Sequence, residues 1–393
     1  MTKTIYLDTS ATTPLDKSVF NEMEPYFSEE YGNAGSMHNK GLIAAQALNR
    51  SRDRVSRILN CFPKEIIFTG SGTESINMAL KGVAEKYKDK GKHIISTTIE
   101  HHAVLDTLDF LKEQGFEITL VEVEPNGIVD PNKIKEAIRK DTILVSVMYA
   151  NNEIGTIQPI KEISKITEEK GILLHTDACQ AGNSESLDVE SLGVDLLSLN
   201  GSKIYGPKGI GCLYRKSSVS LSPLIHGGGQ EFGLRSGTEN IPAIVGFAKA
   251  LEMSQKNKED YTTRLSQLRD YLIEKLLEIP DSFLNGDKEK RVPNNVNITF
   301  LNAEGESILL MLTEEGICAS TGSACTSKSL DPSHVILALG RPYEVAHGSM
   351  RFTLSKDTTK EDLEKVIALM PSIIKKLRGM SPVILSLNEV KNV

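Results

Sequence analysis

The sequence predicts an α/β protein with a mostly parallel central sheet and helices on both of its faces. Short apolar runs alternate with amphipathic stretches from about residue 40 to residue 215. Such alternation is typical of parallel strands that are joined by helices. The strands are expected at 65–69, 93–97, 117–121, 142–148 and 172–177, followed by a run that reaches Leu197.

Polar motifs follow these runs, at the ends of the predicted strands. They begin just after Phe68, Thr97, Met148, Leu174 and Leu197. Ligands of open parallel sheets bind beyond the carboxyl ends of the strands. This edge is therefore where the sequence places the functional site.

Two helices are expected early in the chain. Apolar residues recur at helical spacing at Leu42, Ala45, Leu48, Val55 and Ile58, which predicts that this face packs on the core. A second helix is predicted over 74–88, directly after the first strand of the sheet.

The last third of the chain predicts a second, smaller α/β domain. A helical region opens at Asn240 and ends near Pro280, followed by a strand at 295–300, a helix at 306–312 and a strand at 350–354. Thr358 or Thr359 is expected to cap a last long helix. A length of 393 residues suggests two domains. We expect a large domain at 15–257 and a small domain made of 1–14 and 258–393, which carries a cysteine loop at about 320–332.

Composition and charge indicate a globular protein of the cytoplasm. A net charge of −7 argues against nucleic acid or an anionic membrane as the main partner. No apolar run approaches the roughly 20 residues of a membrane helix, and the first residues lack the apolar core of a signal peptide. The five cysteines form no CxxC pair, so neither a disulfide framework nor a resident metal site is expected.

Asp177 and Lys203 follow two successive apolar runs, and together they suit pyridoxal phosphate (PLP). A carboxylate keeps the pyridine nitrogen of PLP protonated, and an amine binds its aldehyde covalently. A strand-end Asp is more often an N-cap or an ion-pair partner, and most lysines lie on the surface. Lys203 is preferred to Lys208 because Lys208 lies in a Gly-Pro-Lys-Gly turn. Gln180 could bond the phenolic oxygen of PLP or face solvent.

Two further motifs could serve a cofactor. Thr69-Gly-Ser-Gly-Thr-Glu-Ser75 joins a strand to a helix and could bind a phosphate, although an ordinary capped turn explains it equally well. It lacks the GK[ST] ending of a nucleotide P-loop. His101 and His102 follow a strand, and one of them could stack on the cofactor and act as acid or base. Thr238 follows a glycine-rich stretch and could reach a phosphate, either in its own subunit or in a neighbouring one.

Cys325 differs from the other four cysteines in its surroundings. It lies in Ser320-Thr-Gly-Ser-Ala-Cys325-Thr-Ser, where small residues predict exposure, and a nucleophilic thiol must be accessible. Cys179, Cys212 and Cys318 lie in apolar segments and are expected to be inert core thiols. Arg351 begins a strand and could hold a substrate carboxylate, although a surface salt bridge is the commoner role.

The ordered set of motifs resembles the cysteine desulfurases of the NifS/IscS type. The resemblance runs from Tyr6 to about Ile367. Its most specific stretches are Glu100-His-His-Ala-Val, Asn151-Asn-Glu-Ile-Gly155, His175-Thr-Asp-Ala-Cys-Gln180, Arg235-Ser-Gly-Thr238 and the Cys325 loop. The resemblance implies a homodimeric PLP enzyme of fold type I that removes sulfur from L-cysteine.

The same resemblance implies a role for each matched residue. Lys203 binds the PLP aldehyde and moves protons, Asp177 pairs with the ring nitrogen, and Gln180 contacts the phenolic oxygen. His101 stacks on the ring and assists proton transfer. The phosphate is bound by Gly72, Thr73 and, from the partner subunit, Thr238, while Asn200 and Ser202 can still donate to it. Substrate is oriented by Asn152 and Arg351 with the help of Asn33. Cys325 takes the sulfur as a persulfide.

The implied product of this chemistry is sulfur for other proteins. The resemblance implies delivery of this sulfur to an IscU/NifU-like scaffold that assembles iron–sulfur clusters, with Cys325 a transient ligand of a [2Fe-2S] cluster on the scaffold. It also implies a supply of sulfur for tRNA thiolation.

The chain departs from the family pattern at several positions. Asn200-Gly-Ser-Lys203 replaces Ser-x-His-Lys, Phe232 replaces an Arg, and Ala34-Gly35 replaces Pro-Ser. One alternative keeps the fold and changes the substrate, as in a selenocysteine lyase. Another is a catalytically weak PLP-fold partner in sulfur relay or assembly, which the changed residues Asn200 and Ser202 favour. An aminotransferase would need no thiol loop.

Overall fold

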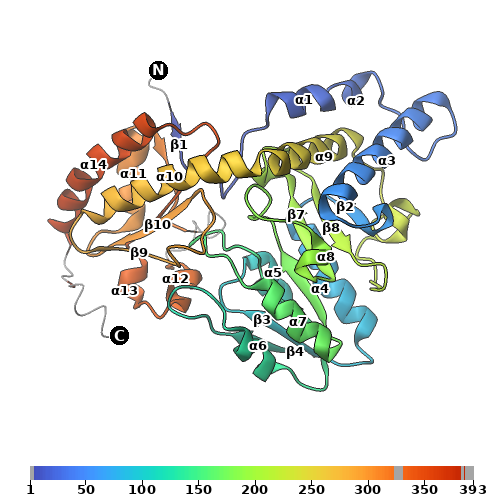
Figure 1. Cartoon of the computed structure of the whole chain (residues 1–393), viewed down its shortest axis with the longest axis horizontal. Coiled ribbons are helices and arrows are strands. Elements are labelled where there is room, and N and C mark those ends of the chain that lie inside the picture. Colours follow the sequence, from blue (N-terminus) through green and yellow to red (C-terminus); the bar gives the residue numbers. More distant parts are fainter. Residues whose placement is uncertain (1–3, 323–330, 382–384, 386–393) are drawn as a thin grey trace.

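The computed structural model describes residues 4–322, 331–381 and 385, which form two units that differ in size (Figure 1). The larger unit is built on a seven-stranded sheet in the order β2-β8-β7-β6-β5-β3-β4. Its strands are β2 (Ile66–Thr69), β3 (His93–Thr97), β4 (Glu117–Val121), β5 (Thr142–Ser146), β6 (Leu173–Asp177), β7 (Leu196–Asn200) and β8 (Gly211–Arg215). β8 is antiparallel to both of its neighbours, and the pairs among β3 to β7 are parallel. The mostly parallel sheet predicted from the sequence is confirmed.

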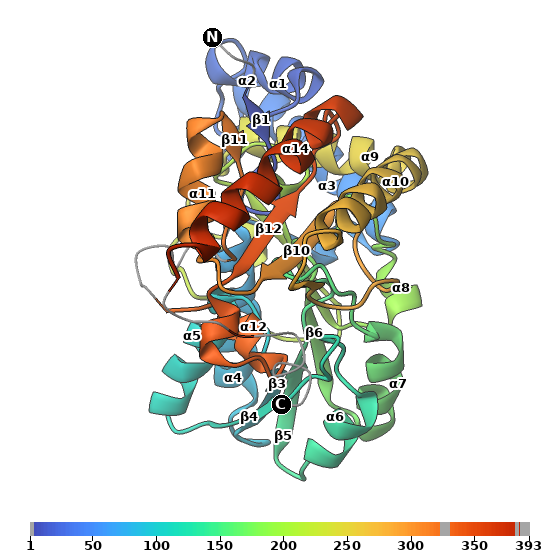
Figure 2. The ribbon, with the colours of Figure 1, turned by 90° about the vertical axis from the view of Figure 1, so that its left-hand side faces the viewer.

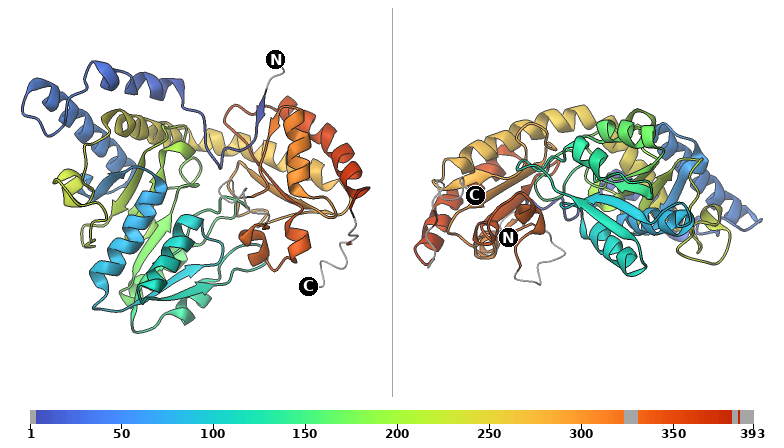
Figure 3. Two further views of the ribbon diagram at one scale, coloured as in Figure 1. Left: turned by 180° about the vertical axis from the view of Figure 1, so that it is seen from behind. Right: turned by 90° about the horizontal axis from the view of Figure 1, so that it is seen from below.

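Helices cover both faces of this sheet. They are α3 (Asn39–Leu59), α4 (Gly72–Tyr87), α5 (His102–Glu113), α6 (Pro131–Ala137), α7 (Ile160–Lys170), α8 (Val189–Leu192) and α9 (Ile241–Lys256). Before them come α1 (Lys17–Met23) and α2 (Pro25–Ser28), and three short 3-10 turns are η1 (Pro63–Glu65), η2 (Gly201–Lys203) and η3 (Gln230–Gly233). Figure 3 shows the helices on the two sides of the sheet.

Alternate residues of each strand enter two different cores. Ile67, Ile94 and Leu144 pack with α4 and α5. Their neighbours Phe68, Ile95 and Val145 pack with α3, α7 and α9 on the opposite face. A strand buried on both faces needs a nearly continuous apolar run, because successive side chains point to opposite sides.

The apolar face predicted for α3 is only half right. Leu48 and Val55 are buried, but Leu42 is 50% exposed. The buried face instead includes Ala44, Ala47 and the charged Arg52, whose guanidinium pairs with buried Glu231 at 2.6 Å. A charge pattern alone could not predict this pairing, since Glu231 lies 179 residues further along the chain.

The smaller unit combines a three-stranded sheet with helices. Its elements are β1 (Ile5–Tyr6), α10 (Lys258–Leu277), β9 (Ser282–Leu284), β10 (Asn295–Phe300), α11 (Gly305–Glu314), β11 (Ile317–Cys318), α12 (His334–Ala338), α13 (Tyr343–Ala346), β12 (Ser349–Thr353) and α14 (Lys360–Arg378). β10 pairs with both β9 and β12 in antiparallel fashion. The capping box of α14 is formed by Thr359 and Asp362, so Thr359 is the cap.

The N-terminal segment joins the smaller unit. β1 pairs with β11 in parallel, and Ile5 and Leu7 belong to the core that α10 and α14 share (Figure 2). Val335 and Ile336 of α12, in contrast, belong to the core of the larger unit. The domain limits given above stay a prediction, since the segment around α12 packs across them. Among the described helices, none has the length and apolar character needed to span a membrane.

Candidate active site

A cavity of about 280 Å³ lies at the carboxyl ends of β6 and β7. Ten residues predicted for the site line it: Gly72, Thr73, His101, Asn152, Asp177, Gln180, Asn200, Ser202, Lys203 and Arg351. They come from α4, from the turns after β3, β5, β6 and β7, and from β12 of the smaller unit. The fold therefore brings together residues as far apart in the sequence as Gly72 and Arg351.

Lys203 reaches the cavity from η2, the turn that follows β7. Its Nζ donates hydrogen bonds to the carbonyl oxygens of Ser10 and Ala11 at 2.7 and 2.5 Å. Both carbonyls belong to the N-terminal segment, which crosses from the smaller unit. The amine is thus held at the cavity wall by neutral acceptors that a covalent partner could replace.

Asp177 ends β6 and is only 5% exposed. Its Oδ1 accepts a hydrogen bond from the backbone N–H of Cys179 at 2.9 Å. This bond fixes the carboxylate beside the cavity. A buried carboxylate at this place is suited to accept an N–H from a pyridinium ring, because an ionised acceptor makes the stronger bond.

His101 is the N-cap of α5. Its Nδ1 accepts from the backbone N–H of Ala103 at 3.0 Å, so the neutral ring carries its hydrogen on Nε2. Burial lowers the pKa of His101, with Asp177 opposing this effect and Lys203 adding to it. A neutral imidazole with one defined tautomer suits both stacking and proton transfer.

The N-terminus of α4 forms a narrow cradle. A Cβ on Gly72 would lie 2.7 Å from the Cys179 Sγ and 3.1 Å from the Asn200 Cβ, so glycine is required there. Ser71 is the N-cap, and its hydroxyl accepts from the N–H of Glu74. The other N–H groups of the first turn, which lack partners inside the helix, are suited to bind a phosphate. The capped turn is therefore present, and phosphate binding by the same motif stays a prediction.

Asn200 and Ser202 lie next to this cradle. The Asn200 Oδ1 accepts from the N–H and the hydroxyl of Ser202, both at 3.2 Å. The two residues that depart from the family pattern therefore bond to each other. The amide nitrogen of Asn200 is the group that faces the cradle, 3.4 Å from the Cβ position of Gly72.

Arg351 enters the cavity from β12 and is buried to 1% exposure. Its Nη2 donates to Asp8 Oδ1 at 2.7 Å and its Nη1 to the carbonyl oxygen of Asn152 at 3.0 Å. The surface salt bridge considered above is excluded, because this ion pair is buried. Burial raises the pKa of Asp8, although the adjacent guanidinium opposes the shift.

Comparison with known proteins agrees with this geometry. The class-V aminotransferase family model matches residues 5–366. The cysteine desulfurase IscS of Methanosarcina thermophila is 51% identical over 97% of this chain and 94% of its own length. That of Dictyoglomus turgidum is 50% identical over 97% of both. Among solved structures, a NifS-like protein has a TM-score of 0.88 at 36% identity and covers 96% of this chain and 99% of its own.

The chain belongs to the IscS cysteine desulfurase family. Members of this class-V aminotransferase family are PLP enzymes. The residues fit that cofactor: the glycine cradle at α4 would hold a phosphate, and Asp177 and Lys203 face the same cavity. A second solved structure, named as SspA in complex with cysteine, has a TM-score of 0.80 at 36% identity and covers 89% of this chain and 99% of its own.

Two residues implied by the family resemblance, Asn33 and Thr238, do not line this cavity, and a third cannot be placed. Asn33 lies in an exposed loop between α2 and α3, where its Oδ1 accepts from the N–H of Gly35 at 2.9 Å. Thr238 is exposed and follows η3. Cys325 lies in 323–330, outside the described residues. A substrate role for Asn33 stays a prediction, as does the role of Thr238, which the resemblance assigns to the site of a partner subunit.

Sequence reasoning missed residues that the desulfurase family fold brings to the cavity. Cys179, expected to be an inert core thiol, lines it two positions after Asp177. Burial raises the pKa of its thiol well above the ordinary value, so the group stays protonated and unreactive as expected. Ser10 and Ala11 also line the cavity, and their position after a strand-like run ending in Asp8 was the available signal.

Proposed function

We propose that this protein is a PLP-dependent cysteine desulfurase that converts L-cysteine to L-alanine and transfers the sulfur to Cys325 as a persulfide. The observation that carries the proposal is the cavity that gathers Lys203, Asp177 and Arg351 at the end of the sheet. The chain's 51% identity to a cysteine desulfurase IscS supports the same activity.

The residues of the cavity divide the binding of PLP among them. Lys203 would hold the aldehyde and Asp177 the pyridine nitrogen, while the N-terminus of α4 with Asn200 and Ser202 would hold the phosphate. His101 would cover a face of the ring. When bound, PLP supplies an electron sink that weakens the bonds around the Cα and Cβ of an amino acid.

Arg351 and Asn152 would orient the substrate. A guanidinium binds a carboxylate through two parallel hydrogen bonds, which fixes the direction of the amino acid. Lys203 Nζ would accept and return protons, and His101 Nε2–H would hold a proton near the substrate thiol.

Cys325 would complete the sulfur transfer. Its thiolate attacks the substrate sulfur, an S–S bond forms, and the Cβ–S bond breaks with its electron pair left on the carbon skeleton. A proton added at Cβ then gives alanine. For this attack the Cys325 thiol must be accessible and partly ionised.

The partners of the reaction follow from the same chemistry. We propose a homodimer in which Thr238 of one subunit reaches the phosphate site of the other, while Asn33 helps to orient the substrate. The persulfide would pass to an IscU/NifU-like scaffold for iron–sulfur clusters, with Cys325 a transient cluster ligand, and to tRNA thiolation. A cytoplasmic location is part of this proposal.

One experiment separates this function from its alternatives. Purified protein supplied with PLP is assayed for alanine and sulfide from L-cysteine with a reductant, beside Cys325→Ala and Lys203→Ala. Borohydride reduction followed by peptide mapping then identifies the lysine that holds the cofactor. We expect turnover in the wild type, loss of turnover in both variants and label on Lys203.

The alternative functions have their own outcomes in this assay. Full turnover by Cys325→Ala would exclude the sulfur-transfer step. Preference for selenocysteine would identify a selenocysteine lyase. Colourless protein that cannot be reconstituted would favour an assembly or relay partner, which the exchanged phosphate-side residues Asn200 and Ser202 would explain.

A further inference from the structure

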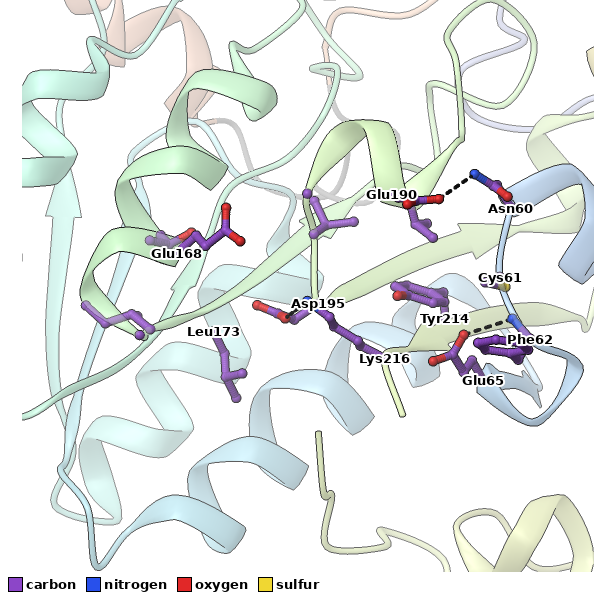
Figure 4. Close-up of a pocket in the computed structure, with 16 residues that line it drawn as sticks. Asn60, Cys61, Phe62, Glu65, Glu168, Leu173, Glu190, Asp195, Tyr214 and Lys216 are labelled. Carbon is purple, nitrogen blue, oxygen red and sulfur yellow. Dashed lines mark hydrogen bonds and ion pairs between the residues drawn. The ribbon is translucent and has the colours of Figure 1, made fainter. Parts of the chain in front are cut away.

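A second and larger cavity, which we call the basal cleft, opens at the edge of the central sheet opposite the active site. Its volume is about 790 Å³, within the range of small-molecule sites. Figure 4 shows its walls, which come from the chain after α3, the C-terminal end of α7, and α8. Leu173 at the start of β6 lines it, whereas Asp177 at the end of the same strand lines the active site.

Two helices direct their negative ends at the basal cleft. α3, of 21 residues, is followed by the C-cap residue Asn60, and α7, of 11 residues, by the C-cap residue Gly171. Both of these C-cap residues line the cleft. The last carbonyl groups of a helix carry a partial negative charge that stabilises a nearby cation.

Carboxylates add to this negative potential. Glu65, Glu168, Glu190 and Asp195 line the cleft, against one cation, Lys216. Lys216 lies 3.4 Å from Asp195, and Glu190 accepts a hydrogen bond from the amide of Asn60 at 3.0 Å. Within the described part of the chain, Glu168 has no ion-pair or hydrogen-bond partner through its side chain.

Tyr214 provides an independent sign of a ligand. The residue is only 5% exposed and lines the cleft, yet its hydroxyl has no hydrogen-bond partner among the described residues. Its oxygen lies on the side of the ring that faces Asp195 (Figure 4). Burial and the charge of Glu65 raise the pKa of this phenol, so the hydroxyl stays neutral and its lone pairs are available to an N–H donor. The hydroxyl is not among the fully buried side-chain atoms that lack a partner in the described part of the chain, so it is open to the cleft and can bond to a ligand there.

The remaining walls are apolar and suit a hydrocarbon chain. Phe62, Ile172, Leu173 and Val189 line the same cleft. A metal ion is a poorer fit, because no three His, Cys, Asp or Glu side chains within the described ranges lie close enough together to hold one. The ligand that matches dispersed negative groups over apolar walls is an extended organic cation.

We propose that the basal cleft binds an aliphatic polyamine. The ammonium groups of the polyamine would lie near Glu168, Glu190 and the Tyr214 hydroxyl, and its methylene chain would lie along the apolar wall. This site is separate from the proposed desulfurase function and does not rest on it.

Calorimetric titration of the PLP-loaded protein with spermidine tests the proposal. The test variant is Glu168→Gln/Glu190→Gln, and the matched control is Glu162→Gln/Glu169→Gln on the exposed surface of α7 outside the cleft. Both double variants change the net charge equally. We expect saturable one-site binding that weakens about tenfold or more in the test variant and stays near the wild-type affinity in the control.

A third variant and a second probe complete the experiment. Tyr214→Phe removes the hydroxyl with little change in volume and should weaken spermidine binding several-fold. Absence of saturable binding, or equal weakening in both double variants, would overturn the proposal, since equal weakening reports only general attraction to an acidic protein. Tighter binding of a Lys-rich peptide than of spermidine would also overturn it in favour of a protein partner.

Discussion

Arg351 Nη2 lies 2.7 Å from Asp8 Oδ1, so the guanidinium assigned to the substrate carboxylate already has a carboxylate partner. Its Nη1 is bonded to the Asn152 carbonyl, and its Nε is buried without a partner among the described residues. Asp8 therefore aims the guanidinium into the cavity while leaving it a donor to use. Substrate binding must compete with, or share, this ion pair.

Replacement of Arg351 by Lys should raise KM for cysteine about tenfold or more, with a smaller effect on kcat. Lysine keeps the positive charge that Asp8 requires, but it cannot offer two parallel N–H groups to a carboxylate. Steady-state kinetics measure the effect, and thermal unfolding of the same variant serves as the control. An unchanged KM would show that another group binds the substrate carboxylate.

Replacement of Gly72 by Ala should weaken PLP binding by about tenfold, since overpacking costs roughly 1–3 kcal/mol. The added Cβ would lie 2.7 Å from the Cys179 Sγ and would push on the cradle. Titration with PLP, followed by visible absorbance, measures the change.

The matched variant for this test is Gly72→Ala/Cys179→Ala, which removes the clashing sulfur. We expect it to recover part of the lost affinity, with the Asn200 contact at 3.1 Å limiting the recovery. Equal affinity in Gly72→Ala and the wild type would contradict the cradle. Cys179→Ala alone should leave turnover unchanged, because the thiol stays protonated.

Glu153 lies against the described chain on both sides of residues 323–330, the range that holds Cys325. Its Oε2 accepts from the Ser333 hydroxyl at 2.5 Å, and a Cβ on Gly322 would lie 2.8 Å from the same oxygen. Glu153→Ala should therefore lower alanine formation about tenfold to a hundredfold, because small displacements of a reacting group are costly. The PLP absorbance should stay normal, since Glu153 does not line the cofactor cavity.

Two results would speak against this anchoring role. One is normal turnover in Glu153→Ala, and the other is loss of PLP together with turnover. Ser333→Ala removes a single hydrogen bond and should produce a milder loss in the same direction.

The strands of the larger unit could be predicted from the sequence because burial on both faces requires apolar runs. β8 was missed, since Gly211–Arg215 follows the Lys208 turn closely and its reversed direction depends on pairing with β2. That pairing joins residues far apart in the chain, which no local pattern reports.

In the active site, too, local sequence predicts which residues follow strands but does not predict contacts between distant segments. Asp177, Lys203 and His101 follow strands, and the fold brings strand ends to one edge, so their convergence could be predicted. The contacts of Asp8 with Arg351 and of Ser10 with Lys203 span 343 and 193 positions. They depend on the N-terminal segment crossing between the two units.

Glu100 should make the protein less stable as the pH rises toward 8. The residue is fully buried, and its Oε1 accepts from Thr97 and from the N–H of Met148, while Oε2 has no partner among the described residues. Burial raises the pKa of Glu100 from 4.5 to about 8. The folded protein thus keeps a proton that the unfolded chain releases above about pH 4.5.

The sign of the effect follows from this difference in bound protons. Between the two pKa values the folded state binds more protons, so its stability falls with rising pH, by at most about 1.4 kcal/mol per pH unit. Glu100→Gln lacks this slope because its amide does not titrate. Denaturant unfolding of both proteins at about pH 5.5 and 7.5 should show the variant gaining stability relative to the wild type. A constant difference between the two proteins would mean that Glu100 is ionised in the folded state.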